Sequence, residues 1–217
     1  MSDEALLSSW RQKDASAGEL LFDRHYETVR RFFRNKVPPE AMRDLMHQVF
    51  AACIEEHTRF PQRSTFRTYL LGIAHLVMID HLRGSPGRQA GQLDLTELIL
   101  EEVNPTGGDA IAAKRERRLL LRALRNLRFP LQVALELRFW ESMSDAEIAE
   151  VLDEPLDAVK TRLRTGRTAL EAQLAELAGS PEELRSTLDS LHRWATRVRQ
   201  ATVPATARER DERHRLG

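Results

Sequence analysis

Cationic and hydroxyl side chains gather in one segment near residue 165. The sequence LDAVKTRLRTGRTAL, residues 156–170, interleaves them with leucine and valine at helical spacing. Lysine and arginine can bind guanine edges and phosphates, and threonine can hydrogen-bond to bases or to the DNA backbone. A helix that presents such a face suits the major groove of DNA. The predicted DNA-contacting residues are Lys160, Thr161, Arg162, Arg164, Thr165, Arg167 and Thr168.

The residues before this segment predict how it is positioned. Ser144 to Glu147 read SDAE, which is a capping box that starts a short helix. Small Ala149 on that helix would let a second helix approach closely, and Asp153–Pro155 predict the turn. An ordinary antiparallel helix pair with a solvated basic face is the alternative. The capped short helix, the proline-marked turn and the cationic second helix together favour a helix-turn-helix that binds DNA.

Helical periodicity also runs through the first third of the chain. Apolar side chains recur at spacings of three to four in Glu19–Lys36, in Glu40–His57 and in Ser64–Arg83, where Ser64 is the predicted N-cap. Pro38-Pro39 and the loop 58–64 separate these segments. Because no segment alternates convincingly with period two, the sequence predicts an all-α protein.

The charge of the chain is balanced in total but not along its length. It has 33 basic and 33 acidic residues among 217. Residues 84–113 carry one basic residue against five acidic ones, and residues 114–128 carry seven basic residues and one acidic residue. We therefore expect an acidic linker between two small helical domains with basic surfaces.

Several functional classes are not expected from this composition. No apolar run approaches the roughly 20 residues of a membrane span, and the single Cys53 permits no internal disulfide. The sequence has no HExxH motif, no metal-spaced Cys/His cluster and no glycine loop that could hold a phosphate. We expect a cytoplasmic, non-enzymatic protein without membrane contact, metal or cofactor.

Two segments, in order, resemble the extracytoplasmic-function (ECF) type of sigma-70 family factor. Residues 44–83 are similar to region 2, which typically reads D-L-x-Q-[ED]-x-F and then F-x-x-W-L-x-x-I-A-x-N-x-x-x-D-x-x-R. Residues 124–170 are similar to region 4. The region 2 residues that match are Asp44, Leu45, Phe50, Phe66, Leu70, Ile73, Ala74, Asp80 and Arg83.

The resemblance implies a fold, partners and site residues. Region 2 of the family binds the clamp helices of RNA polymerase and captures unstacked bases of the promoter −10 element, and region 4 holds the −35 element. Core RNA polymerase, promoter DNA and an anti-sigma factor are the implied partners. The implied polymerase contacts are Asp44, Leu45, His47 and Gln48, and the implied −10 contacts are Arg59, Arg63, Ser64, Arg67, Tyr69 and His75. Tyr69, which replaces the usual tryptophan, could instead be a core residue.

Three departures from the family pattern affect function. His47 replaces the usual glutamine. His75-Leu76 replace a frequent Arg-Asn pair, and the Leu76 side chain, unlike that of asparagine, cannot hydrogen-bond to base edges. His75 could contact DNA or be a neutral surface histidine. Gly166 inside the recognition helix could allow close approach to the DNA backbone or have no role. A sigma-like adaptor that does not open promoters, and a stand-alone helix-turn-helix regulator, therefore remain alternatives.

The expected organisation has four parts. Residues 1–83 form region 2, 84–113 the acidic linker, 114–178 region 4, and 179–217 a C-terminal helix with a charged tail. The last helix is predicted from a capping box at Ser180 and a leucine stripe that follows it. It could pack on region 4, or it could be an autoinhibitory or partner-binding element.

Overall fold

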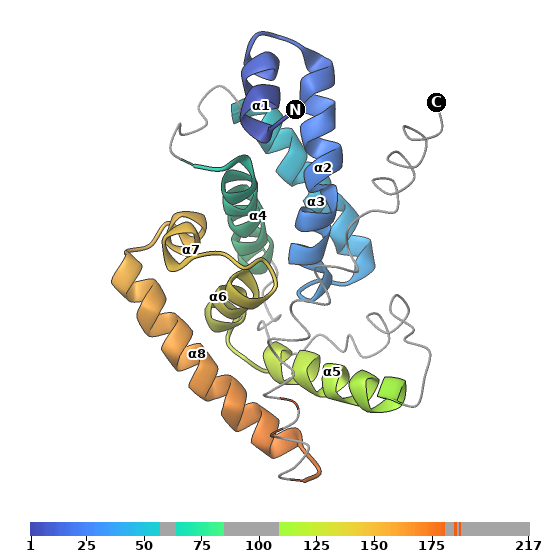
Figure 1. Ribbon diagram of the computed structural model, residues 1–217, viewed down its shortest axis with the longest axis vertical. Helices are drawn as coiled ribbons and strands as arrows, with labels where there is room; N and C mark the ends of the chain where they lie inside the picture. Colours follow the sequence, from blue (N-terminus) through green and yellow to red (C-terminus); the bar gives the residue numbers. More distant parts are fainter. Residues whose placement is uncertain (57–63, 85–108, 181–184, 186, 188–217) are drawn as a thin grey trace.

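The computed structural model describes residues 1–56, 64–84, 109–180, 185 and 187, and within these every regular element is a helix (Figure 1). The first four helices form an N-terminal unit and the next four a C-terminal unit. The helices are α1 (Asp3–Arg11), α2 (Ala15–Arg34), α3 (Pro39–Glu56), α4 (Phe66–Arg83), α5 (Asp109–Arg125), α6 (Phe129–Phe139), α7 (Asp145–Leu152) and α8 (Leu156–Leu177).

The N-terminal unit includes a helix that the sequence analysis does not predict. α1 starts at an N-cap, Ser2, and buries Leu6, Leu7 and Trp10 against the unit. Trp10 lies so close to Gly18 of α2 that a Cβ on Gly18 would come within 2.7 Å of the indole nitrogen. Any side chain at that position would displace the tryptophan, so the contact depends on glycine.

The three predicted helices of this unit form close to their expected limits. α3 buries Leu45, Val49 and Cys53, as its apolar stripe predicts. The N-cap of α4 is Thr65 and not Ser64, because the Thr65 hydroxyl accepts the hydrogen bond from the Thr68 amide at 3.1 Å. The prediction of Ser64 as the cap is therefore wrong by one residue.

The C-terminal unit contains the predicted helix-turn-helix. The capping box at the start of α7 is complete, with Ser144 and Glu147 each bonded to the other's backbone amide. The C-cap of α7 is Asp153, whose φ of 52° and ψ of 49° place it in the left-handed region, and Pro155 precedes α8. α5 begins at Asp109, so residues 109–113, predicted as linker, are helical.

The two units share one apolar interior. Buried residues of α1–α4 form a continuous cluster with Phe129, Val133, Ile148 and Val151 of α6 and α7. α7 lies against α4, as Figure 1 shows. A second, smaller cluster lies within the C-terminal unit, where it includes Leu124, Leu135, Trp140 and Leu170. The shared cluster fixes how the C-terminal unit sits on the N-terminal one.

Some predictions fall outside the described residues. They are Arg59 and Arg63 of the loop before α4, most of the acidic linker (85–108), and the C-terminal helix with its leucine stripe.

Candidate nucleic-acid and polymerase interfaces

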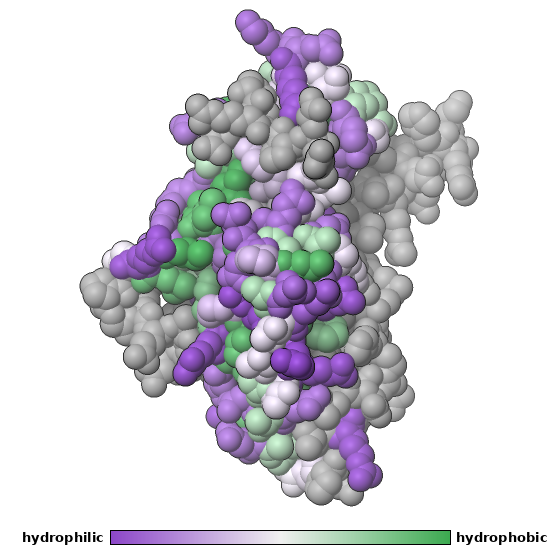
Figure 2. All heavy atoms as spheres, turned by 90° about the vertical axis from the view of Figure 1, so that its left-hand side faces the viewer, coloured by the Kyte–Doolittle hydropathy of each residue, from purple (hydrophilic) through white to green (hydrophobic). Residues whose placement is uncertain are grey.

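The outward face of α8 carries the predicted DNA-contacting side chains. All of them are solvent-exposed except Arg162, which is half-buried. Figure 2 turns the left-hand side of Figure 1 toward the viewer and shows a face on which hydrophilic side chains predominate, with a strip of hydrophobic ones at the height of α4 and α7. The fold therefore leaves the cationic and hydroxyl groups of α8 accessible to a nucleic acid.

Carboxylates of the same region position some of these cations. Arg162 donates a hydrogen bond to the Glu154 carboxylate at 2.6 Å, and both side chains are largely shielded from solvent. Lys160 lies 3.5 Å from Asp157, but there both side chains are mostly exposed, so water and salt screen the pair. Arg164 has no ion pair of this kind among the contacts that the structure shows, and it extends into solvent. Of the arginines on this face, Arg164 is thus freer to meet phosphate than Arg162.

Gly166 faces the protein interior. It is buried, and a Cβ at this position would lie 3.2 to 3.5 Å from three carbon atoms of Leu135 on α6. The hypothesis that this glycine lets DNA approach is wrong in this conformation, as is the view that it has no role. Its missing side chain lets α8 pack closely on α6.

The predicted polymerase-contacting residues divide into two groups. Asp44, His47 and Gln48 are exposed together on the outer side of α3. Leu45 is only 3% exposed and belongs to the shared core. It therefore supports the surface from below and does not itself form part of it.

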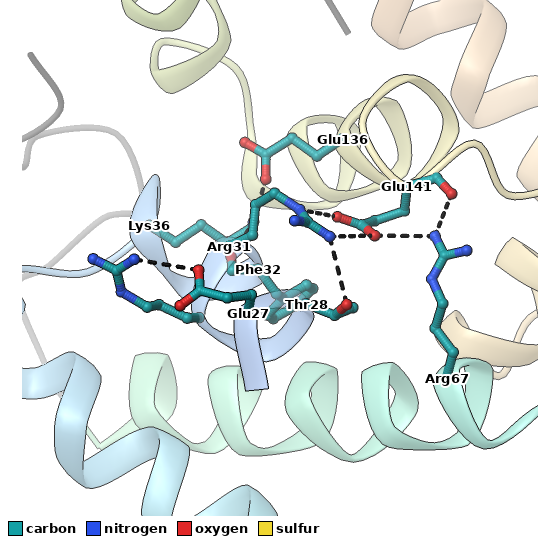
Figure 3. A network of polar contacts seen from close by, with 9 residues as sticks. Glu27, Thr28, Arg31, Phe32, Lys36, Arg67, Glu136 and Glu141 are labelled. Atoms are coloured by element: carbon teal, nitrogen blue, oxygen red, sulfur yellow. Dashed lines mark hydrogen bonds and ion pairs between the residues drawn. The ribbon is translucent and has the colours of Figure 1, made fainter. Parts of the chain in front are cut away.

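The predicted −10 contacts within residues 64–84, the part of this region that the structure describes, do not form an open surface. The Arg67 guanidinium donates a hydrogen bond to the backbone carbonyl of Glu141 and another to its carboxylate, the second at 3.0 Å (Figure 3). Tyr69 is half-buried and packs against the shared core, in agreement with the core alternative. Ser64, also half-buried, donates its hydroxyl hydrogen bond to the Thr65 carbonyl at 3.1 Å. Arg67, at least, is occupied by the C-terminal unit.

His75 is buried between the two units. It is 7% exposed, and its ring stacks on that of Phe129. Burial lowers the pKa of His75 to about 4, because desolvation disfavours the charged imidazolium; Glu154 opposes this shift, and Lys36 and Arg162 add to it. His75 is thus neither a DNA contact nor a surface histidine in this conformation.

A polar interface that the sequence analysis missed joins α2 to the C-terminal unit. Glu141 accepts hydrogen bonds from Arg31 at 2.6 and 3.1 Å as well as from Arg67 (Figure 3). Further inside, the Lys36 ammonium pairs with Glu136, and both side chains are nearly inaccessible to solvent. Ions are costly to bury unless they are paired and hydrogen-bonded, so these pairs need both units in place.

Neutral side chains complete the inner part of this polar interface. Asn35 and Gln132 donate hydrogen bonds to Glu136 at 3.1 and 2.9 Å, and Arg125 donates one to Asn35 at 3.0 Å. One feature of the sequence does indicate this buried polar interface. Gln132 and Glu136 lie four residues apart within the apolar segment FPLQVALELRF, where a lone carboxylate on a buried helix needs a cationic partner.

The fold and these surfaces define a class of protein: an all-helical protein in which a helix-turn-helix presents a cationic face. Comparison with known families makes the assignment narrower. Residues 21–85 match the family model for sigma-70 region 2, and residues 117–170 match the model for sigma-70 region 4. This chain belongs to the sigma-70 family and is of the ECF type.

Similar proteins agree with this assignment. The ECF RNA polymerase sigma-E factor of Haemophilus influenzae is 25% identical over 185 residues, which cover 82% of this chain and 97% of that protein. The Escherichia coli protein of the same name is 23% identical over 185 residues, covering 82% and 96%. The solved structure of CnrH in complex with the cytosolic domain of CnrY has the same fold, with a TM-score of 0.61, 21% identity and coverage of 81% of this chain and 99% of that one.

Two features are absent from the described residues. None of the helices there combines the length and the hydrophobicity needed to cross a membrane. The same part of the chain holds no group of three or more His, Cys, Asp or Glu side chains that could bind a metal ion.

Proposed function

We propose that this chain is an alternative sigma factor, which binds core RNA polymerase and directs promoter-specific transcription initiation. One observation carries the proposal: both sigma regions occur in order along one chain, and each leaves the polar side chains of one helix exposed. On region 2 this face is the outer side of α3, and on region 4 it is the cationic side of α8. The names of the similar sigma-E factors support the same role.

In this proposal each face has a distinct task. Asp44, His47 and Gln48 dock on the polymerase clamp, with Leu45 holding α3 from within. The exposed residues of α8, among them Arg164 and Thr165, bind the −35 element through phosphates and base edges. The proposed −10 surface is the loop before α4 and the first half of α4, with Arg59, Arg63, Ser64, Arg67, Tyr69 and His75 as its contacts. Arg67 and His75 can take part only where Glu141 and Phe129 do not cover them.

The proposed organisation keeps region 2 in residues 1–83 and region 4 up to residue 178, with the acidic linker between them and a C-terminal extension after them. The protein acts in the cytoplasm, where polymerase and promoter are found, and it contributes binding energy to initiation and no covalent chemistry of its own. CnrH, which shares the fold, was solved with the cytosolic domain of CnrY. An inhibitory protein partner of this kind is part of the proposal.

Reconstituted transcription tests the proposed function. Purified chain and core RNA polymerase are incubated with a genomic promoter library, and the 5′ ends of transcripts are mapped. Specific starts that depend on the chain are expected. Polymerase binding without starts would indicate an adaptor, and DNA binding without polymerase would indicate a stand-alone regulator; either result would contradict the proposal.

A second candidate has a specific observation in its favour. Leu76, where the family often has asparagine, is 61% exposed on α4 and offers no hydrogen bond to a flipped base. Reading an extruded base depends on such polar contacts and on stacking, which offset the cost of unstacking. A sigma-like adaptor that binds polymerase without melting DNA would need neither. Replacing Leu76 by Asn and measuring permanganate reactivity of promoter thymines separates weak melting from none.

A further inference from the structure

We propose that the outer side of α5 is a docking surface for an acidic, amphipathic helix of a partner protein. This arginine face consists of Arg118 and Arg122 on α5 and of Asn126 and Arg128 in the turn that follows. It is separate from the proposed DNA-contacting side of α8 and from the proposed polymerase contacts on α3. The arginine face does not depend on the proposed function; only its occupation while α8 is on DNA rests on that function.

The arginine face forms because α5 is buried on one side only. Leu120 and Leu124 are 1% and 2% exposed and belong to the second apolar cluster. Positions 118 and 122 lie four residues apart and therefore on one side of the helix, opposite these leucines. Arg118 and Arg122 are both exposed. The packing of α5 thus presents two guanidinium groups to solvent on a helix that is held firmly from behind.

The positive charge of the arginine face is not balanced by carboxylates in the part of the chain that the structure describes. There, no acidic side chain pairs with Arg118, Arg122 or Arg128. Arg118 and Arg122 are also like charges at a spacing of four, which destabilises a helix. The helix dipole favours cations in the last turn, so it accounts for Arg122 but not for Arg118 or Arg128. An anionic partner would account for all three.

Leucines beside the arginines favour a protein partner over a nucleic acid. Leu119 lies three residues before Arg122 and is half-buried. Leu131, also half-buried, lies three residues after Arg128. Side chains at this spacing are neighbours on a helix, so each arginine stands beside accessible apolar carbon. A phosphate backbone has no apolar surface to cover such leucines, whereas protein interfaces combine arginine with apolar side chains.

The cationic side of α8 has a different composition. There the cations alternate with the hydroxyls of Thr161, Thr165 and Thr168, which can bind phosphates and bases. The four residues of the arginine face include neither a hydroxyl side chain nor a lysine. A guanidinium group binds both oxygens of a carboxylate in one plane, through two of its N–H groups. The two surfaces therefore suit two partners, DNA on α8 and glutamate or aspartate side chains on α5.

The spacing of the arginines fits a helical partner. Arg118 and Arg122 are separated by about 6 Å along the axis of α5. Glutamates four residues apart on a partner helix repeat the same distance, so both ion pairs can form when the helices pack side by side. A leucine between those glutamates can reach Leu119. The partner segment is thus an amphipathic helix with acidic and apolar side chains on the same side.

The arginine face and the DNA-contacting face lie on opposite sides of the C-terminal unit. α5 packs on α8 through the second cluster, which includes Leu120, Leu124, Leu170 and Leu174, and each helix is exposed on the side away from it. Figure 1 shows α5 extending away from α8. Two helix diameters, roughly 20 Å, separate the faces, whereas the Debye length is about 8 Å at physiological salt. DNA and the acidic helix can therefore be bound together.

Binding of a designed peptide tests the proposal. The probe is a fluorescently labelled helical peptide with glutamates four residues apart and leucines between them on the same side. A scrambled peptide of identical composition is the control. In fluorescence anisotropy the full chain should bind the patterned peptide about tenfold more tightly than the scrambled one. The variant Arg118→Gln/Arg122→Gln/Arg128→Gln should lose that preference. A parent chain that does not distinguish the two peptides would overturn the proposal.

Matched variants separate the arginine face from charge elsewhere. Lys13→Gln/Arg43→Gln/Arg83→Gln removes three exposed cations from the N-terminal unit and should bind the patterned peptide like the parent. Leu119→Ala should weaken binding about fivefold, because part of the apolar contact is lost. An unchanged affinity of Leu119→Ala would contradict an amphipathic partner. Circular dichroism of every variant checks that the fold is retained. Equal affinities of the parent and the chain lacking the three arginines would refute the proposal.

Competitors distinguish the classes of partner and keep this inference apart from the proposed function. A single-stranded oligonucleotide should not displace the peptide from an Arg164→Gln chain; displacement would assign the arginine face to nucleic acid and overturn the proposal. Where transcripts map a promoter, its −35 duplex should leave peptide affinity unchanged, and mutual exclusion would contradict the separation of the two faces. Absence of transcripts would contradict the sigma function alone, since peptide binding needs neither polymerase nor promoter.

Discussion

The imidazole ring of His75 lies parallel to the phenyl ring of Phe129, with 6.0 Å between the ring centroids and 6° between the planes. The first residue belongs to α4 and the second opens α6, so this stack is a point where region 2 and region 4 meet. It also buries a titratable group where the two regions meet, which makes the stability of the folded protein depend on pH.

Acidification should lower the free energy of unfolding through His75. Its pKa is about 4 in this structure and 6.5 when exposed, so the stabilising contribution is complete above pH 6.5 and is lost as the pH falls from 6.5 to 4. By pH 5 the loss should be about 2 kcal/mol. Urea unfolding at pH 7.5 and pH 5.0 measures it.

The charged groups that face His75 are Glu154, Lys36 and Arg162, and burial outweighs all three in setting its pKa. A His75→Phe variant should lose about 2 kcal/mol less between the two pH values than the parent. His25, whose pKa is also lowered by burial despite its contact with Asp3, keeps its own share of the pH dependence in both chains. Identical slopes for parent and variant would show that His75 is not the titrating group.

Enlarging Gly166 should separate α8 from α6. The side chain of Gly166→Leu would collide with Leu135, and we expect a loss of about 1–3 kcal/mol in unfolding free energy. Thermal melting followed by circular dichroism measures it. Adding Leu135→Ala to the variant should recover part of the loss, because it makes room for the new side chain; no recovery would place the clash elsewhere.

Breaking the buried ion pair from one side should cost more than removing both charges. Lys36→Met leaves the Glu136 carboxylate without its cation, at an expected cost of about 3–5 kcal/mol. The double variant Lys36→Met/Glu136→Gln keeps the hydrogen bonds to Asn35 and Gln132 and should regain most of that stability. Chemical denaturation compares the unfolding free energies of the parent and the two variants. A double variant that is no more stable than Lys36→Met would argue against the pairing.

Truncating an exposed arginine of α8 should weaken DNA binding. Arg164→Ala should lower affinity for a −35 duplex about tenfold and reduce the dependence of binding on salt, since roughly one phosphate contact is lost. Fluorescence anisotropy at several salt concentrations measures both effects. Arg122→Ala, which removes an exposed charge from α5, is the matched control and should bind like the parent.

The outer side of α3 should determine polymerase affinity. Asp44→Ala should reduce binding to core polymerase about tenfold, as expected when a charged hydrogen-bonding partner is lost. Asp23→Ala, also exposed but on α2, serves as the control. Competition for core polymerase against a labelled parent chain measures the difference. Equal competition by both variants would remove Asp44 from the interface.

Much of this fold could be predicted because its signals are local. The capping box at Ser144, the turn at Asp153–Pro155 and the apolar stripe through Leu45 and Val49 each act within a few residues. The exposed face of α8 follows from the same periodicity. α1 was missed although Ser2, Asp3 and Glu4 give it an N-cap and an acidic first turn.

The contacts between the two regions could not be predicted in the same way. Arg67 and Glu141 are 74 positions apart, and an arginine on a half-exposed helix face suits a DNA phosphate as well as a carboxylate. Within its own helix His75 resembles a surface histidine, and Gly166 resembles a residue that merely destabilises the helix. Their roles depend on Phe129 and Leu135, which belong to another helix altogether.

The apolar interior that the two regions share has a consequence for how the chain can evolve. Val133 of α6 and Val151 of α7 must fit region 4 when it stands alone on DNA and must also fit region 2 when the two are packed together. A substitution at either position must therefore be compatible with the packing in both arrangements. A substitution at one of these positions in region 4 therefore favours a compensating substitution in region 2, so the sequences of the two regions are expected to change together.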